Sequence, residues 1–266
     1  MLLVMLYHRS DAEKNREYIA LFRNECQKRG IGFALHTVDE EESGCFCSFP
    51  ADTVFINRSR EWKLAESLEQ HGFRVYNSSI VARLGNDKAA AAKQFGEWGI
   101  PMMKSYDSPP ERYPFVMKSC SGHGGSEVFL IHSETELFEK QKLLCGRPVL
   151  YQEFCDCPGK DLRLYIVKNR IAAAMLRESA DDFRSNYSLG GSARPVDPGK
   201  KERALAERIL SHISLDFAAI DLIYHRGEPV FNELEDAAGS RMLYRFSDID
   251  IVAVFMDQLF SSVPGR

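Results

Sequence analysis

Apolar and polar positions along the first 80 residues follow the pattern of short strands alternating with helices. Residues 1–6 form an apolar run typical of a buried strand, and residues 11–29 carry apolar side chains four positions apart, which indicates a helix ended by Gly30. Further strands are expected in this region at 32–38, 53–56 and 73–76, with a second helix at 60–70. This alternation favours a small parallel α/β sheet.

The pattern changes after residue 80, where short polar connections join most of the predicted strands. Residues 87–98 form an Ala-rich helix that ends at Gly99, and strands at 115–118 and 127–131 flank a glycine-rich connection. The other elements expected here are a helix at 134–144, strands at 149–154, 162–167 and 171–176, a helix at 201–213, hairpin strands at 217–224 and 229–233, and a helix at 249–260. Short connections of this kind favour antiparallel sheets.

The composition is that of a globular protein and limits the partners to consider. The chain has 266 residues, of which 44% are hydrophobic and 27% charged, a length that suits one large domain or two to three small lobes. The formal net charge of −4 provides no general attraction to nucleic acid or to an anionic membrane, so neither is an expected partner. A polyanionic ligand must therefore be held by a local cluster of cations.

Cysteine content and hydropathy indicate a soluble cytoplasmic protein. The seven cysteines are an odd number in a chain too long to need disulfides, so reduced thiols are expected. The pairs Cys45/Cys47 and Cys155/Cys157 lack the usual spacing of zinc ligands, which favours free thiols over a zinc site. Residues 1–7 lack the basic leader of a secretory signal, and the longest later apolar run, 171–176, is too short to cross a membrane.

The glycine-rich connection at residues 119–126 is the first candidate for chemistry. Backbone that is free of large side chains can bring several N–H groups against phosphate oxygens, and Lys118 directly before it supplies a positive charge. The sequence is neither a Walker A loop nor a dinucleotide-binding fingerprint. An ordinary flexible hairpin remains the alternative for this segment.

Three carboxylates near the end of the chain form a second candidate site. A three-residue hairpin loop at Arg226-Gly227-Glu228 would place Asp221 opposite Glu233, with Glu235 on the same face. Carboxylates so close together repel unless a cation lies among them, and oxygen ligands suit Mg²⁺ or Mn²⁺. The alternative is a solvated acidic edge of the hairpin.

A polar loop at residues 181–186 follows the strand that ends at Arg177. Its Arg184 and Asn186 are groups that can neutralise charge on phosphoryl oxygens beside a metal centre. Taken alone, this segment is equally typical of a turn.

Six segments, in their order along the chain, resemble the landmarks of a known superfamily. They are Asn86-Asp87-Lys88, Pro114-Phe115-Val116-Met117-Lys118, Tyr151-Gln152-Glu153-Phe154, Gly159-Lys160-Asp161-Leu162-Arg163, Phe183-Arg184-Ser185-Asn186 with Gly190-Gly191, and Ala219-Ile220-Asp221-Leu222. Together they resemble the ATP-grasp superfamily and, within it, the RimK-like carboxylate–amine ligases. The resemblance covers residues 77–260 and extends more loosely to the N-terminal 76.

The resemblance implies an α/β fold with α+β lobes, in which two lobes enclose ATP. It divides the chain into an N-terminal α/β lobe at 1–80, a central lobe at 81–154 and a C-terminal lobe at 155–266. The residues it assigns to ATP are Lys88, Lys118, Ser121, Gly122, Gly124, Gly125, Gln152, Glu153, Phe154 and Asp161. The residues it assigns to Mg²⁺ or Mn²⁺ are Asp221, Glu233 and Glu235, and those it assigns to catalysis are Arg163, Arg184 and Asn186.

The chain departs from the family pattern at Glu235, where the family carries an asparagine. A carboxylate there adds attraction for a metal ion but also repels phosphate oxygens. The activity implied is an ATP-dependent ligase that forms an amide bond through an acylphosphate. An ATP-grasp kinase and a non-catalytic nucleotide-binding protein are the alternatives.

The substrates are less well defined than the nucleotide. Arg58 and Arg241 are candidates to hold a substrate carboxylate, because a guanidinium binds a carboxylate in bidentate fashion. A small carboxylate and an amine are expected as partners of ATP. An amino acid, a peptide or a protein tail all suit the sequence, and a homo-oligomer is compatible with it.

Overall fold

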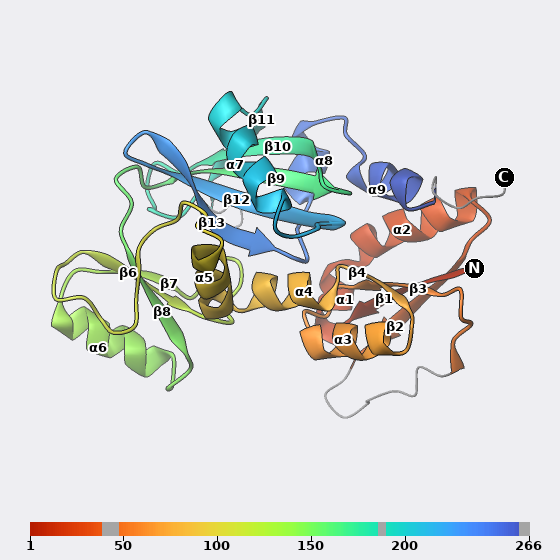
Figure 1. Cartoon of the computed structure of the whole chain (residues 1–266), viewed down its shortest axis with the longest axis horizontal. Helices are drawn as coiled ribbons and strands as arrows, with labels where there is room; N and C mark the ends of the chain where they lie inside the picture. Colours follow the sequence, from red (N-terminus) through yellow and green to blue (C-terminus); the bar gives the residue numbers. More distant parts are fainter. Residues whose placement is uncertain (39–47, 186–189, 261–266) are drawn as a thin grey trace.

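The computed structural model describes residues 1–38, 48–185 and 190–260. Three sheets organise this part of the chain, with strand orders β2-β1-β3-β4, β5-β8-β6-β7 and β11-β10-β9-β12-β13 (Figure 1). The predictions for Cys45, Cys47 and Asn186 lie outside the described residues.

The first sheet is parallel, as predicted, and is built from β1 (Leu2–Tyr7), β2 (Gly32–Thr37), β3 (Val54–Asn57) and β4 (Arg74–Tyr76). Its helices are α1 (Arg9–Lys14), α2 (Arg16–Lys28), α3 (Trp62–Gln70) and α4 (Ser79–Asn86). Residues Leu3, Met5 and Tyr7 of β1 share a core with α2, whereas Val4 and Leu6 share one with α3. Because successive side chains of a strand point to opposite faces, β1 is buried on both sides.

The single helix predicted at 11–29 is wrong in one respect, because α1 and α2 are separate helices that meet at Asn15. The Asn15 side chain donates to the carbonyl of Asp11 at 2.7 Å, and its backbone leaves the helical range. A side-chain amide that binds nearby backbone competes with the helix in this way. Gly30 ends α2 as expected, with φ +65°.

The second sheet is antiparallel and contains β5 (Ser105–Tyr106), β6 (Phe115–Ser119), β7 (Val128–Ile131) and β8 (Val149–Glu153). Helix α6 (Glu134–Leu143) follows β7, and α5 (Lys88–Glu97) precedes the sheet. Asp87 caps α5 by accepting from the backbone N–H groups of Ala89 and Ala90, each at 3.0 Å. This cap fixes the position of Lys88 at the first turn of the helix.

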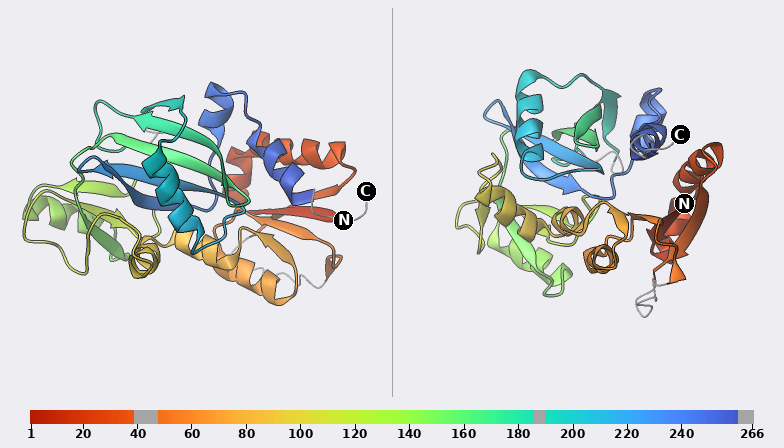
Figure 2. Two further views of the ribbon diagram at one scale, coloured as in Figure 1. Left: turned by 45° about the horizontal axis from the view of Figure 1, so that its top comes forward. Right: turned by 45° about the vertical axis from the view of Figure 1, so that its right-hand side comes forward.

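The third sheet is antiparallel and contains β9 (Lys160–Val167), β10 (Arg170–Glu178), β11 (Ser192–Pro195), β12 (Phe217–His225) and β13 (Glu228–Glu235). Its helices are α7 (Lys200–Leu210), α8 (Arg241–Phe246) and α9 (Ile251–Phe260). Helix α9 returns to lie beside α2 of the N-terminal lobe, where Phe255 contacts Phe22 (Figure 2). The N-terminal lobe and the third sheet therefore share one hydrophobic core.

The hairpin between β12 and β13 has a different loop from the one predicted, but the predicted pair of carboxylates is present. The loop has two residues, Arg226 and Gly227, both with positive φ, so the predicted three-residue loop is wrong. A β-bulge at Asn232 then shifts the register by one residue, and Asp221 does pair with Glu233 as expected. The pattern of alternating side chains alone does not reveal the bulge.

Candidate active site

Two neighbouring cavities occupy the centre of the molecule. The first, called here the inter-sheet cavity, measures about 90 Å³ and lies between the second and third sheets. The second, called here the lobe cavity, measures about 460 Å³ and lies between the N-terminal lobe and the third sheet. Gly124 and Glu235 line both, so the two cavities adjoin at these residues.

Two lysines from different elements line the inter-sheet cavity, as the sequence predicts for Lys88 and Lys118. Lys88 Nζ forms an ion pair with Glu233 Oε1 at 2.7 Å and donates to the carbonyl of Gly122 at 2.6 Å. Lys118 Nζ donates to Asn232 Oδ1 at 3.0 Å. The bulge described above is what brings Asn232 to this position.

The environment of Lys118 favours an anionic ligand. Burial lowers the pKa of the Lys118 ammonium to about 8, with Lys88 acting in the same direction and Glu233 opposing both. Its one hydrogen-bond partner among the described residues is an amide, which carries no charge. A buried cation in such a setting is stabilised by an incoming anion.

The glycine-rich connection lies over the junction of the two cavities. Gly124 and Gly125 have φ values of +66° and +78°, a conformation that favours glycine. Arg184, whose side chain is held by Asp182, donates to the carbonyl of Gly125 at 2.7 Å and so ties this connection to the segment that follows β10. Among the described residues of the connection, Ser121 and Gly122 line neither cavity.

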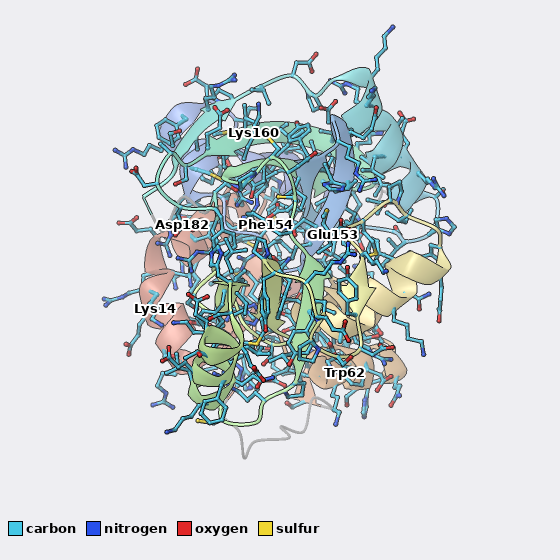
Figure 3. The ribbon with its side chains drawn as sticks, turned by 90° about the vertical axis from the view of Figure 1, so that its left-hand side faces the viewer. Lys14, Trp62, Glu153, Phe154, Lys160 and Asp182 are labelled. Carbon is cyan, nitrogen blue, oxygen red and sulfur yellow. The ribbon has the colours of Figure 1, made fainter. Side chains whose placement is uncertain are left out.

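The segment between the second and third sheets forms another wall of the inter-sheet cavity. Gln152 and Glu153 end β8, Phe154 follows them, and all three line the cavity (Figure 3). The backbone N–H of Glu153 donates to the carbonyl of Lys104 at 2.9 Å. The apolar lining includes Met103, Val116, Val128, Phe183 and Ile223, which suit a flat ring system.

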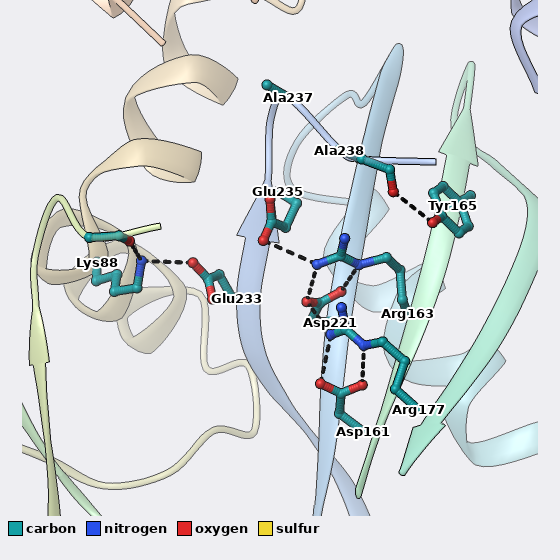
Figure 4. A network of polar contacts seen from close by, with 12 residues as sticks. Lys88, Asp161, Arg163, Tyr165, Arg177, Asp221, Glu233, Glu235, Ala237 and Ala238 are labelled. Carbon is teal, nitrogen blue, oxygen red and sulfur yellow. Dashed lines mark hydrogen bonds and ion pairs between the residues drawn. The ribbon is translucent and has the colours of Figure 1, made fainter. Parts of the chain in front are cut away.

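A network of arginines and carboxylates, drawn in Figure 4, borders the two cavities. Arg163 on β9 binds both oxygens of Asp221, at 2.8 and 2.6 Å, and reaches Glu235 Oε1 at 3.1 Å. Arg177 on β10 binds Asp161 in bidentate fashion and Asp221 Oδ2 at 2.7 Å. Burial acts to raise the pKa of Asp221, but the two guanidinium groups outweigh it and hold the pKa at about 2.

This network bears on the three predicted metal ligands. Asp221 lines neither cavity, and guanidinium groups engage both of its oxygens, whereas Glu233 and Glu235 line the inter-sheet cavity. Within residues 1–38, 48–185 and 190–260, no group of three or more His, Cys, Asp or Glu side chains is arranged to hold a metal ion. Glu233 and Glu235 fit a divalent cation by their chemistry, and the assignment of Asp221 to a metal stays a prediction.

The other predicted residues divide between the two cavities. Asp161 and Arg184 line the inter-sheet cavity, while Arg58, Arg163 and Arg241 line the lobe cavity. Sequence reasoning did not find Tyr7, Tyr18 and Ser240, which also line the lobe cavity, whereas His123 lines it from within the predicted glycine-rich connection. Tyr7, Tyr18 and Ser240 carry no motif, and tertiary packing alone brings them together. Cys155 and Cys157 are free thiols in the wall of the inter-sheet cavity.

These features define a class of protein: two antiparallel lobes that enclose a lysine-lined cavity beneath a glycine-rich connection are characteristic of nucleotide-grasping enzymes. Residues 91–259 match the model of the RimK-like ATP-grasp domain. The chain belongs to this family.

A curated relative and two solved structures illustrate the similarity. The probable alpha-L-glutamate ligase of Xanthomonas oryzae pv. oryzae is 28% identical over 247 residues, which cover 87% of this chain and 83% of the relative. A RimK-domain ATP-grasp protein from Sphaerobacter thermophilus has a TM-score of 0.73 at 20% identity, covering 97% of this chain and 98% of its own. The ATP-grasp ligase PsnB, complexed with a phosphomimetic precursor variant, Mg and ADP, has a TM-score of 0.69 at 16% identity, with 97% of both chains covered.

The predicted ATP-grasp fold and family are therefore confirmed. The protein is an ATP-dependent carboxylate–amine ligase, an enzyme that uses ATP and binds a carboxylate and an amine. Among the described helices, none is long and apolar enough to span a membrane.

Proposed function

We propose that the protein activates a carboxylate with ATP and joins it to the amino group of glutamate. The observation that carries this proposal is the contact of the two cavities at Gly124 and Glu235. ATP is assigned to the inter-sheet cavity, which must widen beyond its 90 Å³ to admit the nucleotide, with the γ-phosphate at this junction. The acid and the amino acid are assigned to the lobe cavity, whose 460 Å³ lies in the range of small-molecule sites.

The phosphates of ATP have suitable partners in the inter-sheet cavity. Lys88 and Lys118 supply positive charge, and the backbone N–H groups near Gly124 supply neutral donors. A divalent cation, Mg²⁺ or Mn²⁺, would neutralise phosphate charge, and Glu233 and Glu235 are the residues that fit it. The apolar walls beside Phe154 suit the adenine ring.

The reaction takes place in two steps at the junction. A carboxylate oxygen of the acid attacks the γ-phosphorus, the bond to ADP breaks, and an acylphosphate forms. The neutral amine then attacks the carbonyl carbon, loses its proton, and inorganic phosphate departs with the former carboxylate oxygen. Arg163 lines the lobe cavity beside Glu235, where its guanidinium can stabilise the oxyanion of the tetrahedral intermediate.

Water must be excluded while the acylphosphate exists, because hydrolysis would waste ATP. The bond from Arg184 to the Gly125 carbonyl holds the glycine-rich connection over the junction. We assign Arg184 this closing role, in addition to any contact with phosphate oxygens.

The charge of the lobe cavity supports an anionic substrate. Lys14, Arg58, Arg60, Arg163, Arg177 and Arg241 line it, against Asp11, Glu235 and Asp236. Glutamate, which gives the probable alpha-L-glutamate ligase described above its name, carries two carboxylates and one amine. The five cysteines in the described part of the chain are free, which agrees with a reducing cytoplasm.

Trapping the acylphosphate with hydroxylamine tests this function. The protein is incubated with ATP, Mg²⁺, L-glutamate and a set of candidate acids, and products are followed by mass spectrometry. The proposal expects an acid-dependent hydroxamate with an equal amount of ADP, and an amide when glutamate replaces hydroxylamine. A stable phosphorylated product without hydroxamate would identify a kinase, and absence of turnover with every acid would contradict ligation.

A further inference from the structure

Of the described residues that line the lobe cavity, His123 is the one histidine, and it lies within the glycine-rich connection. Its neighbour Gly124 lines both cavities, so His123 lies beside the junction assigned above to the reaction. The carbonyl of His123 accepts from Ser126 Oγ at 3.1 Å, whereas neither ring nitrogen has a hydrogen-bond partner among the described residues. The imidazole is therefore available to a ligand in the lobe cavity.

Contacts on both sides of His123 hold the glycine-rich connection in place. Lys88 Nζ donates to the carbonyl of Gly122 at 2.6 Å, and Arg184 Nη1 donates to the carbonyl of Gly125 at 2.7 Å. The first anchor comes from α5 and the second from the segment that follows β10. Because His123 lies between the two anchored carbonyls, its place at the junction does not depend on flexible glycines alone.

The second step of the proposed reaction needs a group that accepts a proton. When the neutral amine attacks the acylphosphate, the new C–N bond leaves a positive charge on nitrogen, and one proton must depart before the amide is complete. Four side chains that line the lobe cavity can accept a proton near neutral pH. They are Asp11, His123, Glu235 and Asp236.

Two of the three carboxylates contact cations. Asp11 forms ion pairs with Arg60 at 3.0 Å and with Lys14 at 3.6 Å, which favour its charged form and so weaken it as a base. Glu235 Oε1 accepts from Arg163 at 3.1 Å. Burial raises the pKa of Glu235 while Arg163 opposes it, but Glu235 is also a residue that fits the divalent cation, which would occupy its oxygens.

The third carboxylate, Asp236, is enclosed by amides. Its two oxygens accept from the side chains of Asn77 and Asn86, at 2.9 and 3.1 Å, and the residue is only 2% exposed. Little of this carboxylate is open to an incoming amine. His123 remains as the proton acceptor that is both unbonded and open to the lobe cavity.

The surroundings of the imidazole keep it neutral in the free enzyme. Although the residue is exposed, removal of its ring from bulk water lowers the pKa of His123 to about 4; the neighbouring cations act in the same direction, and the carboxylates of Asp11 and Glu235 oppose them. Bound phosphate and carboxylate groups add negative charge, which raises this pKa and makes the ring a stronger base when substrates are present. The charged groups near the ring are Asp11, Arg60, Lys88, Glu127 and Glu235.

We infer that His123 is the general base of the amide-forming step. As the amine nitrogen bonds to the carbonyl carbon, the carbonyl electron pair moves to oxygen, and a ring nitrogen of His123 takes one proton from the amine. The carbonyl then re-forms, the bond to phosphate breaks, and the imidazolium releases its proton to solvent. This inference rests on the proposed function and assigns a catalytic residue to its second step.

Measuring the two steps separately tests the inference, with an acid that yields a hydroxamate in the wild type. His123→Gln should form the amide with glutamate about 100-fold more slowly than the wild type, which is the order of effect of a general base. With hydroxylamine in place of glutamate, it should form hydroxamate and ADP at close to the wild-type rate, because hydroxylamine is already neutral at pH 7 and needs little help from a base. The control His132→Gln, at an exposed residue that lines neither cavity, should match the wild type in both assays.

Chemical rescue adds a readout that a structural role would not move. His123→Ala leaves space for a small base, so added imidazole should restore amide formation in proportion to the concentration of neutral imidazole. Normal amide formation in His123→Gln, an equal loss of amide and hydroxamate, or an absence of rescue would each overturn the inference while the proposed function stands. A wild type that forms neither hydroxamate nor amide would overturn both.

Discussion

At the scale of single residues, we expect Lys118 to couple ATP binding to pH. Its pKa is lowered to about 8 by burial, well below that of a lysine in the unfolded chain. A bound phosphate would favour the charged form of Lys118. ATP binding therefore takes up protons at any pH at which Lys118 is neutral in the ATP-free enzyme. We expect ATP affinity to fall as the pH rises from 7 to 9.5, as measured by calorimetry.

Lys118→Met tests whether Lys118 causes the pH dependence of ATP binding. It should weaken ATP binding at pH 7 and flatten the pH dependence above 8, while Lys93→Met on the exposed side of α5 should behave as wild type. The free protein should lose little stability, because the substitution removes a desolvated charge. A Lys118→Met variant whose ATP affinity still falls with pH would assign the effect to another group.

The folded pKa of Lys118 also predicts the stability of the free enzyme. Since the pKa is lower in the folded state, the unfolded chain binds more protons between about pH 8 and the usual lysine range. The contribution of this group to the free energy of unfolding therefore rises with pH across that window. Denaturant titrations of the wild type and Lys118→Met at pH 7.5 and 9.5 measure it: the wild type should gain stability relative to the variant at the higher pH.

Residues of the candidate site differ in how far the sequence reveals them. Lys88, Lys118 and Glu233 lie in short motifs, and the structure places all three around one cavity. Tyr7, Tyr18 and Ser240 stand in segments far apart in the sequence, and none of them lies in a motif. Only the packing of the N-terminal lobe against the third sheet brings them together.

At the scale of elements, the arginines and carboxylates of β9, β10 and β12 act as one unit. Asp221 receives hydrogen bonds from both Arg163 and Arg177, all three being buried. Asp221→Asn leaves two buried guanidinium groups short of negative charge and should lower the free energy of unfolding by about 3 kcal/mol. Chemical denaturation measures this loss.

Glu233→Gln is the variant with which the stability and activity of Asp221→Asn are compared. Glu233 lines the inter-sheet cavity and is partly exposed, so its substitution should cost less stability but raise the Mg²⁺ concentration needed for half-maximal turnover. Similar losses of stability in Asp221→Asn and Glu233→Gln would contradict the separate roles assigned to the two carboxylates.

The β12–β13 hairpin shows where prediction from sequence succeeds and where it stops. Alternation of side chains correctly predicts that Asp221 faces Glu233, although a two-residue loop and a bulge at Asn232 replace the three-residue loop expected. The two differences offset each other because each changes the register by one residue. Short or irregular elements such as α4, β5 and α8 were not predicted, since their patterns are too brief to detect.

The loop of this hairpin provides a test of backbone strain. Gly227 has φ +76°, and a Cβ added there would meet nothing within 4 Å. Gly227→Ala should therefore destabilise the protein by about 1 kcal/mol through backbone conformation alone. Arg226→Gly, at the neighbouring residue with φ +53°, should be neutral or stabilising. An unchanged melting temperature for Gly227→Ala would show that the loop adjusts without cost.

At the scale of the whole molecule, one core joins the N-terminal lobe to the third sheet. Phe255 of α9 is fully buried, stacks on Phe217 at 4.6 Å and contacts Phe22 of α2. Phe255→Ala should cost about 3 to 5 kcal/mol of stability, whereas Phe138→Ala on exposed α6 should cost little. Because this core forms one wall of the lobe cavity, we also expect weaker glutamate binding in the Phe255 variant.

The arrangement of lobes explains why two cavities meet at a single point. The glycine-rich connection and the end of β13 are the elements that border both, through Gly124 and Glu235. Sequence motifs predict the ATP-grasp fold, which the family match and the solved structures confirm. They do not predict the size or charge of the lobe cavity, because its walls come from three separate regions of the chain.

Transfer of an isotope label from the acid to phosphate tests the central claim most directly. An acid that forms a hydroxamate is prepared with ¹⁸O in its carboxylate and incubated with ATP, Mg²⁺ and glutamate, and the released phosphate is analysed by mass spectrometry. Ligation through an acylphosphate at the junction of the two cavities predicts one ¹⁸O atom in each phosphate released with an amide. Amide formation with unlabelled phosphate would contradict the account.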